Sequence, residues 1–341
     1  MQVEFDPRTD AKMVVSGDLY TLTPDHVQQI AEIALRDMQN YGPLERTFVE
    51  GELGGLPTTL ARVDCTVDEF GNIIHYETEE RPAGLGIVER MSDALGIPDD
   101  QNPSRLALTH LEDTFGSLPV SLIEYGSPPN DDGLVLQQKG LNEIYRLDPY
   151  VPVLVRANPA TVERSVGGLD NLRKLQEQSV STVATEGLKH YRIVNDDAQR
   201  FDPNCLPNRN FPFVGKPIQG SKANGLVVYI PKTHEDGRYS QMLDISSYKR
   251  AIETMDGSTS EYIVEPFHPG IPVTIDGLAA VGILRVYVAL SYEKISKEYT
   301  ARVLGGAIVA RPGLLVHGRS DAIGGVVLAP EFVIQIERST L

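Results

Sequence analysis

Positive charge is scarce in this sequence. Its 341 residues include 31 Lys and Arg against 47 Asp and Glu, which gives a net charge of −16 and a pI near 4.9. An acidic surface repels phosphate backbones, so this balance argues against nucleic-acid binding as the main function. A local basic pocket for a small phosphate ligand is compatible with it.

Cysteines and long apolar runs are scarce as well. Cys65 and Cys205 are the only two cysteines, too few for a four-cysteine metal site, and a disulfide between them would close a loop of about 140 residues. We therefore expect free, buried thiols in a reducing compartment. No stretch approaches about 18 uninterrupted apolar residues, and the first residues, MQVEFDPRTDAK, have no apolar signal core. These absences predict a cytoplasmic location and no membrane partner.

Motifs of the common hydrolases are absent too. The sequence contains neither G-x-S-x-G nor H-E-x-x-H, and the spacing of its seven histidines does not suit a metal site. What it does contain is the composition of a folded globular protein, with 41% apolar and 23% charged residues. Its length predicts about two domains, or one large domain with insertions.

Periodicity predicts an α+β chain that becomes β-rich toward its C-terminus. Apolar residues at helical spacing between Thr23-Pro24-Asp25 and Gly42-Pro43 indicate a first helix. Further helices are expected near residues 87–95, 104–115, 168–178 and 247–255. Apolar and alternating runs predict strands at 60–67, 73–79, 120–125 and 151–157, and then in FVGKPI, GLVVYIP, EYIVEPF, ILRVYVALS, YTARVLGGAIVA and GGVVLAPEFVIQI.

A change of composition in the Pro- and Asn-rich stretch 201–212 suggests a boundary. We expect three regions along the chain: an N-terminal region over 1–100 that contains the first hairpin, an α/β region over 101–210, and a β-rich region over 211–341.

The first hairpin gathers charged residues on one face. Arg62 and Asp64 alternate with apolar residues in its first strand, and Glu77 and Glu79 share a face in its second. A four-residue turn sets Asp64 opposite Glu77 and Arg62 opposite Glu79, about 5 Å apart at Cβ. Carboxylates this close repel one another unless a cation joins them, and Mg²⁺ binds a few carboxylates together with phosphate oxygens. The same pattern also fits a solvated hairpin face with an ordinary Arg–Glu pair.

A glycine-containing loop follows Lys216. The stretch FVGKPIQGSKANGLVVYI reads as two strands joined by a loop whose backbone N–H groups, with a lysine, can close over phosphates. A Walker P-loop is not supported, because Ser221 and Lys222 stand in the reverse order and a strand, not a helix, follows. A surface hairpin with two solvated lysines fits the stretch as well.

Together, and in this order, these motifs resemble one family. RVD (62–64) followed by YETE (76–79) is similar to the Arg-x-Asp … Tyr-Glu-x-Asn pattern of the glutathionylspermidine synthetase-like, circularly permuted ATP-grasp ligases. FVGKPIQGSKANGL resembles their Lys-Pro-Ile … Gly-Arg-Glu-Gly-Ala-Asn loop, and LGGAIVARPG … DAIGGVVLAPEFVI resembles their closing segments. The resemblance covers about residues 48–90 and 211–335, and it implies an ATP-grasp-like, circularly permuted fold with a nucleotide between two β-rich lobes.

The resemblance also implies a metal site and two catalytic arginines. Asp64, Glu77 and Glu79 would be the Mg²⁺ ligands. Arg62 would stabilise the transferring phosphoryl group or the acyl phosphate, and Arg311 matches the late arginine of the family.

An ATP site is implied by the same resemblance. YIVEPF (262–267) looks like the hinge strand that recognises adenine, with Glu265 as the polar contact. The phosphates of ATP would meet Lys216 and the loop residues Gly220, Ser221, Lys222 and Gly225.

The function that this resemblance implies is ATP-dependent carboxylate–amine ligation. ATP would convert a carboxylate to an acyl phosphate, and an amine would displace the phosphate to form an amide, so small-molecule or peptide acids and amines are the expected partners. Glu79 stands where the family has Asn, which adds a negative charge to the metal site, and the loop also departs from the family pattern. Two alternatives stay open: an ATP-grasp phosphotransferase, and a catalytically silent scaffold or assembly protein.

Overall fold

The computed structural model of the chain describes residues 2–4, 12–15, 17, 19–41, 58–80, 84–115, 121–124, 142–143, 153–156, 193–194, 199–217, 225–231, 248–259, 261–275, 278–293, 298–311, 323–330 and 333–337. The helix expected at 168–178 and the loop residues Gly220, Ser221 and Lys222 lie outside these ranges.

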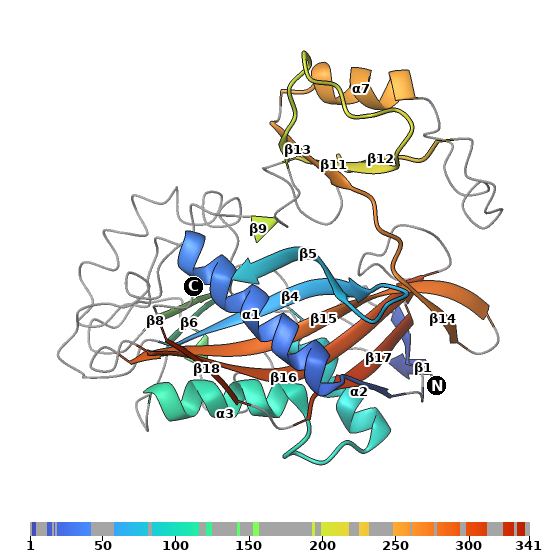
Figure 1. Cartoon of the computed structure of the whole chain (residues 1–341). Coiled ribbons are helices and arrows are strands. Elements are labelled where there is room, and N and C mark those ends of the chain that lie inside the picture. The colour runs from blue at the N-terminus through green and yellow to red at the C-terminus, as the bar shows by residue number, and fades with distance from the viewer. Residues whose placement is uncertain are drawn as a thin grey trace.

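A large mixed sheet forms the core of the molecule (Figure 1). Its eleven described strands are β1 (Gln2–Glu4), β2 (Lys12–Val15), β3 (Tyr20–Thr21), β4 (Thr58–Val67), β5 (Ile73–Glu80), β9 (Ile193–Val194), β14 (Ile271–Ile275), β15 (Leu278–Glu293), β16 (Glu298–Arg311), β17 (Ile323–Leu328) and β18 (Val333–Glu337). The main path has the order β1-β2-β17-β16-β15-β4-β5-β9, and β14, β18 and β3 pair with β15, β16 and β17. Most neighbours are antiparallel, whereas β17 runs parallel to β2 and β3.

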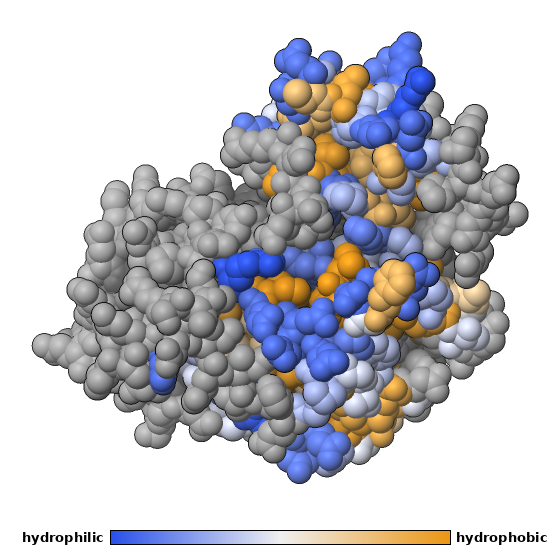
Figure 2. All heavy atoms as spheres, in the orientation of Figure 1, coloured by the Kyte–Doolittle hydropathy of each residue, from blue (hydrophilic) through white to orange (hydrophobic). Residues whose placement is uncertain are grey.

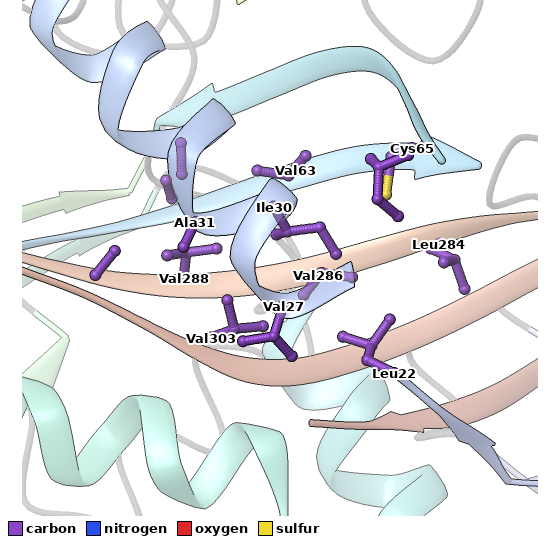
Figure 3. Close-up of a cluster of buried hydrophobic side chains, with 14 of the residues drawn as sticks. Leu22, Val27, Ile30, Ala31, Val63, Cys65, Leu284, Val286, Val288 and Val303 are labelled. Carbon is purple, nitrogen blue, oxygen red and sulfur yellow. The ribbon is translucent and has the colours of Figure 1, made fainter. Parts of the chain in front are cut away.

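Helices cover both faces of this sheet. Helix α1 (Pro24–Tyr41) begins where the sequence predicts, and the hydroxyl of Thr23 accepts a hydrogen bond from the backbone N–H of His26 (3.2 Å). Val27 and Ile30 of α1 pack with Val286 and other apolar residues of β4, β15 and β16 (Figure 3). The solvent side of the molecule around α1 is mostly hydrophilic (Figure 2), as expected for an amphipathic helix.

The opposite face of the sheet is covered by α2 (Leu85–Leu95) and α3 (Pro103–Phe115). Leu85 and Met91 of α2 and Ala107 of α3 share a buried cluster with Tyr287 and Ala289 of β15. Because β15 and β16 are buried on both faces, they read in the sequence as nearly continuous apolar runs.

A smaller four-stranded sheet stands beside the large one (Figure 1). It consists of β10 (Gln199–Arg200), β11 (Phe213–Pro217), β12 (Val227–Tyr229) and β13 (Tyr262–Pro266), antiparallel in the order β10-β13-β11-β12. Helix α7 (Tyr248–Asp256) packs on one face, where the rings of Phe213, Tyr229 and Tyr248 lie within 5.2–6.3 Å of one another. A third sheet of parallel strands contains β6 (Ser121–Glu124), β7 (Asn142–Glu143) and β8 (Val153–Arg156).

These elements agree with the predicted α+β class. The division into regions 1–100, 101–210 and 211–341 stays a prediction, since the large sheet takes strands from both ends of the chain. Cys65 is a free thiol in the apolar cluster under α1, as expected, but Cys205 is exposed, so the prediction of two buried thiols is wrong. Among the described helices, none is long and apolar enough to cross a lipid bilayer.

Candidate functional site

The charged face of the β4–β5 hairpin has the pairing that the sequence predicts. In the Cα register, Asp64 lies opposite Glu77 and Arg62 lies opposite Glu79. Nearer the tip, the register differs by one residue from that of the expected four-residue turn. The turn is one residue longer, and Tyr76 is skipped in the pairing, which produces a β-bulge that restores the two predicted pairs.

Asp68 explains why the turn is longer. Its Oδ1 accepts hydrogen bonds from the backbone N–H groups of Phe70 (2.9 Å) and Asn72 (2.7 Å), and its backbone N–H donates to the Asn72 carbonyl (2.9 Å). The bonds from Asn72 foremost lower the pKa of Asp68. Gly71 takes the left-handed conformation, with φ of 85°, that closes this turn.

The bulge also changes which side chains share a face. Strict alternation from the turn predicts His75 on the charged face beside Glu77. In the structure, His75 and Thr78 both face α1: His75 Nε2 lies 2.9 Å from Thr78 Oγ1, and the Thr78 hydroxyl donates to Asp37 Oδ2 (2.6 Å). His75 therefore lies on the face opposite to the one that strict alternation predicts, because the extra residue shifts the alternation.

Arg62 and Asp64 form a buried ion pair on the other face of the hairpin. Arg62 Nε donates to Oδ1 (2.7 Å) and Nη2 donates to Oδ2 (3.0 Å), and the two side chains are only 5% and 3% exposed. Arg285 lies opposite Asp64 on β15, with its Nε 3.6 Å from Asp64 Oδ2. Both carboxylate oxygens of Asp64 thus contact guanidinium groups.

In this arrangement the described carboxylates do not fit a Mg²⁺ site. No three His, Cys, Asp or Glu side chains converge anywhere in the described part of the chain. Glu77 is half-buried, and the side chain of Glu79 lies outside the described residues. A cation at Asp64 would have to replace a bidentate, charge-assisted contact with Arg62. Mg²⁺ binding therefore stays an expectation from the family resemblance.

Lys216 and Glu265, two predicted nucleotide contacts, lie side by side on the small sheet. Lys216 pairs with Ile263, and Glu265 pairs with Val214, so the two charged residues are diagonal neighbours on one face. Lys216 Nζ and the Glu265 carboxylate form an ion pair, and both side chains are buried.

Two further contacts connect this pair to the large sheet. Lys216 Nζ donates to the backbone carbonyl of Tyr76 (3.0 Å) and lies 5.9 Å from the centre of the Tyr76 ring. The Tyr76 hydroxyl in turn donates to the carbonyl of His268, which follows β13 (2.9 Å). The lysine-bearing face of the small sheet therefore faces the β4–β5 hairpin.

A hollow of about 400 Å³ opens at the end of the small sheet where β11 begins and β13 ends. Phe211, Phe213 and Phe267 line it together with prolines, and Glu265 and His268 supply polar groups. The hollow is open to solvent and mostly apolar, and its volume falls within the range of small-molecule sites.

The other predicted site residues are not brought to the hairpin. Arg311 pairs with Val281 on β15, four positions from Arg285, so strand spacing and rise place its Cα roughly 16 Å from that of Asp64. The carbonyl of Gly225 accepts a hydrogen bond from the Tyr262 hydroxyl (2.9 Å). The rest of the predicted phosphate loop lies outside the described residues.

Arg285 and Tyr76 belong to this site but were not expected from the sequence. Arg285 did have a signal, because it is the single charged residue in the apolar run 278–292 and a buried strand keeps a charge only with a partner. Tyr76 stands in the YETE motif, but that motif does not reveal a bulge.

Comparison with known proteins finds little. No protein-family model and no curated protein matches the chain. A solved structure of a glutathione synthetase-like effector from Globodera pallida, in its apo form, is similar with a TM-score of 0.40 and 11% identity, over 89% of this chain and 80% of that chain. A TM-score this low does not establish a shared fold, so the expectation of an ATP-grasp-like fold rests on the sequence motifs alone.

Proposed function

We propose that this protein is an ATP-dependent carboxylate–amine ligase of the ATP-grasp type, which binds its nucleotide between the small sheet and the β4–β5 hairpin. The observation that carries the proposal is the position of Lys216. Its amine lies where the two sheets meet, in contact with Glu265 of one sheet and Tyr76 of the other.

The groups around Lys216 suit a nucleotide. A lysine amine supplies a compact positive charge for phosphate oxygens. The nearby hollow offers phenylalanine rings for a purine base, and the Glu265 carboxylate is an acceptor for an exocyclic amine. The small sheet therefore offers a cation for phosphate oxygens on one face and aromatic rings for a base at its end.

Arg62 and Arg285 suit both steps of the ligation chemistry. An acceptor carboxylate attacks the γ-phosphorus of ATP, so an acyl phosphate forms and ADP leaves. The amine then attacks the acyl carbon, phosphate leaves, and the amine proton passes to solvent. Both steps need positive charge near the phosphoryl oxygens, and the two guanidinium groups around Asp64 supply it.

Nucleotide binding is tested by thermal melting with and without Mg-ATP. At 100 times its dissociation constant, a ligand stabilises a two-state protein by about 2.7 kcal/mol. The test variant is Lys216→Met combined with Glu265→Gln, because removing one partner alone would leave a buried charge unpaired. We expect the upward shift of the wild type to vanish in this variant and to persist in Lys249→Met, whose lysine is 84% exposed.

Absence of any shift for the wild type at millimolar Mg-ATP would contradict the proposed nucleotide site. Once binding is shown, mixtures of carboxylic acids and amines are screened for release of phosphate. Phosphate release that needs both an acid and an amine supports the ligase. A phosphorylated acid that accumulates without an amine indicates the phosphotransferase instead.

A catalytically silent protein with the same fold is the second candidate, and the state of Asp64 favours it. Arg62 donates to both oxygens of the Asp64 carboxylate, which suits a structural role better than the role of a metal ligand. For this candidate we expect that Mg-ATP does not shift the melting temperature. Replacing Arg62 and Asp64 by apolar residues in a folded variant should also leave any interaction with a partner unchanged.

A further inference from the structure

We propose that Tyr76 is a positioning residue that holds the small sheet against the β4–β5 hairpin and so fixes the Lys216 amine. The link between the sheets consists of contacts within the chain and needs no ligand. Its effect on ligand affinity rests on the proposed nucleotide site.

Tyr76 connects the two sheets through both its backbone and its side chain. Its carbonyl accepts a hydrogen bond from Lys216 of β11 (3.0 Å), and its hydroxyl donates to the carbonyl of His268 after β13 (2.9 Å). These contacts join one position on the large sheet to a strand of the small sheet and to the segment that connects β13 with β14. A single hydrogen bond allows rotation about itself, but two contacts at separate places restrict the orientation of the small sheet.

The bulge explains how one strand carries this link together with the charged pairs. Tyr76 is skipped in the Cα pairing with β4, while Glu77 beside it stays opposite Asp64. A bulge turns the extra residue out of the regular ladder and redirects its groups. The strand can therefore align Glu77 toward Asp64 and still direct Tyr76 toward Lys216.

The position of the lysine depends on this contact. Lys216 is 93% buried and its amine is shared between Glu265 and the Tyr76 carbonyl. A sheet that swings away from the hairpin would remove one of these two partners and leave the amine tied to Glu265 alone. Pre-organisation of the amine near the hairpin lowers the cost of ordering it when a ligand binds.

The test measures the distance between the sheets directly. Cys205 is exposed on the small-sheet side and Cys65 is buried with a raised pKa, so Cys205 reacts selectively with a thiol spin label. A second label at Glu69→Cys marks the exposed hairpin turn. We expect a narrow distance distribution by double electron–electron resonance, and a broad one after Tyr76→Phe, which removes only the hydroxyl. The matched control is Tyr229→Phe, since the Tyr229 hydroxyl also donates to a carbonyl (Arg209, 2.9 Å) but within the small-sheet region.

An unchanged distribution in Tyr76→Phe overturns the proposal, as does equal broadening in Tyr229→Phe. The combined Lys216→Met and Glu265→Gln variant breaks the second contact and should broaden the distribution as well. In the same proteins, the dissociation constant of Mg-ATP should rise about fivefold in Tyr76→Phe, as expected for the loss of one hydrogen bond, and stay unchanged in Tyr229→Phe. If the wild type does not bind Mg-ATP, the proposed function fails, and the distance measurement still decides the role of Tyr76.

Discussion

Buried carboxylates on and beside the hairpin are held by guanidinium groups or by hydrogen-bonding side chains. Asp64 contacts Arg62 and Arg285, and Asp37 of α1 contacts His75 and Thr78. Removing one partner of such a pair leaves the other buried and unsatisfied, whereas removing both replaces the pair with apolar packing.

Asp64→Asn should therefore destabilise the protein by about 3–5 kcal/mol, because Arg62 loses the charge that compensates it in a buried place. The combined Arg62→Met and Asp64→Leu variant should lose far less. Urea unfolding followed by circular dichroism measures both, and an equal loss in the two variants would show that the cost comes from packing and not from an unpaired charge.

The pH dependence of the free energy of unfolding should show a contribution from His75. Burial first, and then the positive charges of Arg36 and Lys216, lower its pKa to about 4, while nearby Glu77 acts in the opposite direction. The folded state thus favours the neutral imidazole, so this contribution is complete above the unfolded pKa of about 6.5 and is lost as the pH falls toward 4.

As the pH falls from about 6.5 to 4, the free energy of unfolding should decrease by about 3 kcal/mol because of His75. The measurement is the urea midpoint between pH 8 and pH 4.5, for the wild type and for His75→Gln, which keeps a donor for Thr78. If the two proteins lose stability equally as the pH falls, carboxylates and not His75 set the acid limit.

At the scale of elements, the sequence predicts the hairpin strands and the pairing of Asp64 with Glu77. Alternation of charged and apolar residues carries that information because one face of the hairpin is buried under α1. Alternation does not reveal the bulge at Tyr76, because its position depends on the hydrogen bonds that Asp68 accepts in the turn and on the contact of Tyr76 with Lys216 of β11. The pairing of Asp64 with Arg285 joins two distant strands, and periodicity within one strand contains no information about its partner.

A second bulge, between β15 and β16, depends on a glycine. Tyr287 pairs with Gly305 and Val288 pairs with Val303, so one residue is extra on β16. Gly305 has φ of 88°, and a Cβ there would lie 2.3 Å from the carbonyl oxygen of Val327. We expect Gly305→Ala to cost about 2 kcal/mol or more, by strain and by steric overlap.

Chemical denaturation of Gly305→Ala checks this expectation. Gly17→Ala is the control, because no atom of the described residues lies within 4 Å of its added methyl group and its φ is not left-handed; its stability should stay within about 0.5 kcal/mol of the wild type. Similar stabilities for both variants would mean that the central strands shift to accept the new side chain.

For the whole molecule, the charge imbalance should set the response to salt. A net charge of −16 repels itself in the compact state. The screening length falls from about 30 Å at 0.01 M to about 8 Å at 0.15 M salt, so the melting temperature should rise over this range. Differential scanning calorimetry in potassium chloride measures it. A falling melting temperature would show that attraction in pairs such as Lys216–Glu265 outweighs the repulsion.

The strand order of the large sheet affects the order in which the chain can fold during synthesis. β4 lies between β5, which follows it at once, and β15, whose Arg285 is more than two hundred positions after Asp64. During synthesis, the Arg62–Asp64 hairpin emerges long before the strand that completes it, and a long-range pairing of this kind slows folding. Until β15 arrives, one edge of β4 has no strand to pair with, and this is the stage at which the chain depends most on protection from aggregation.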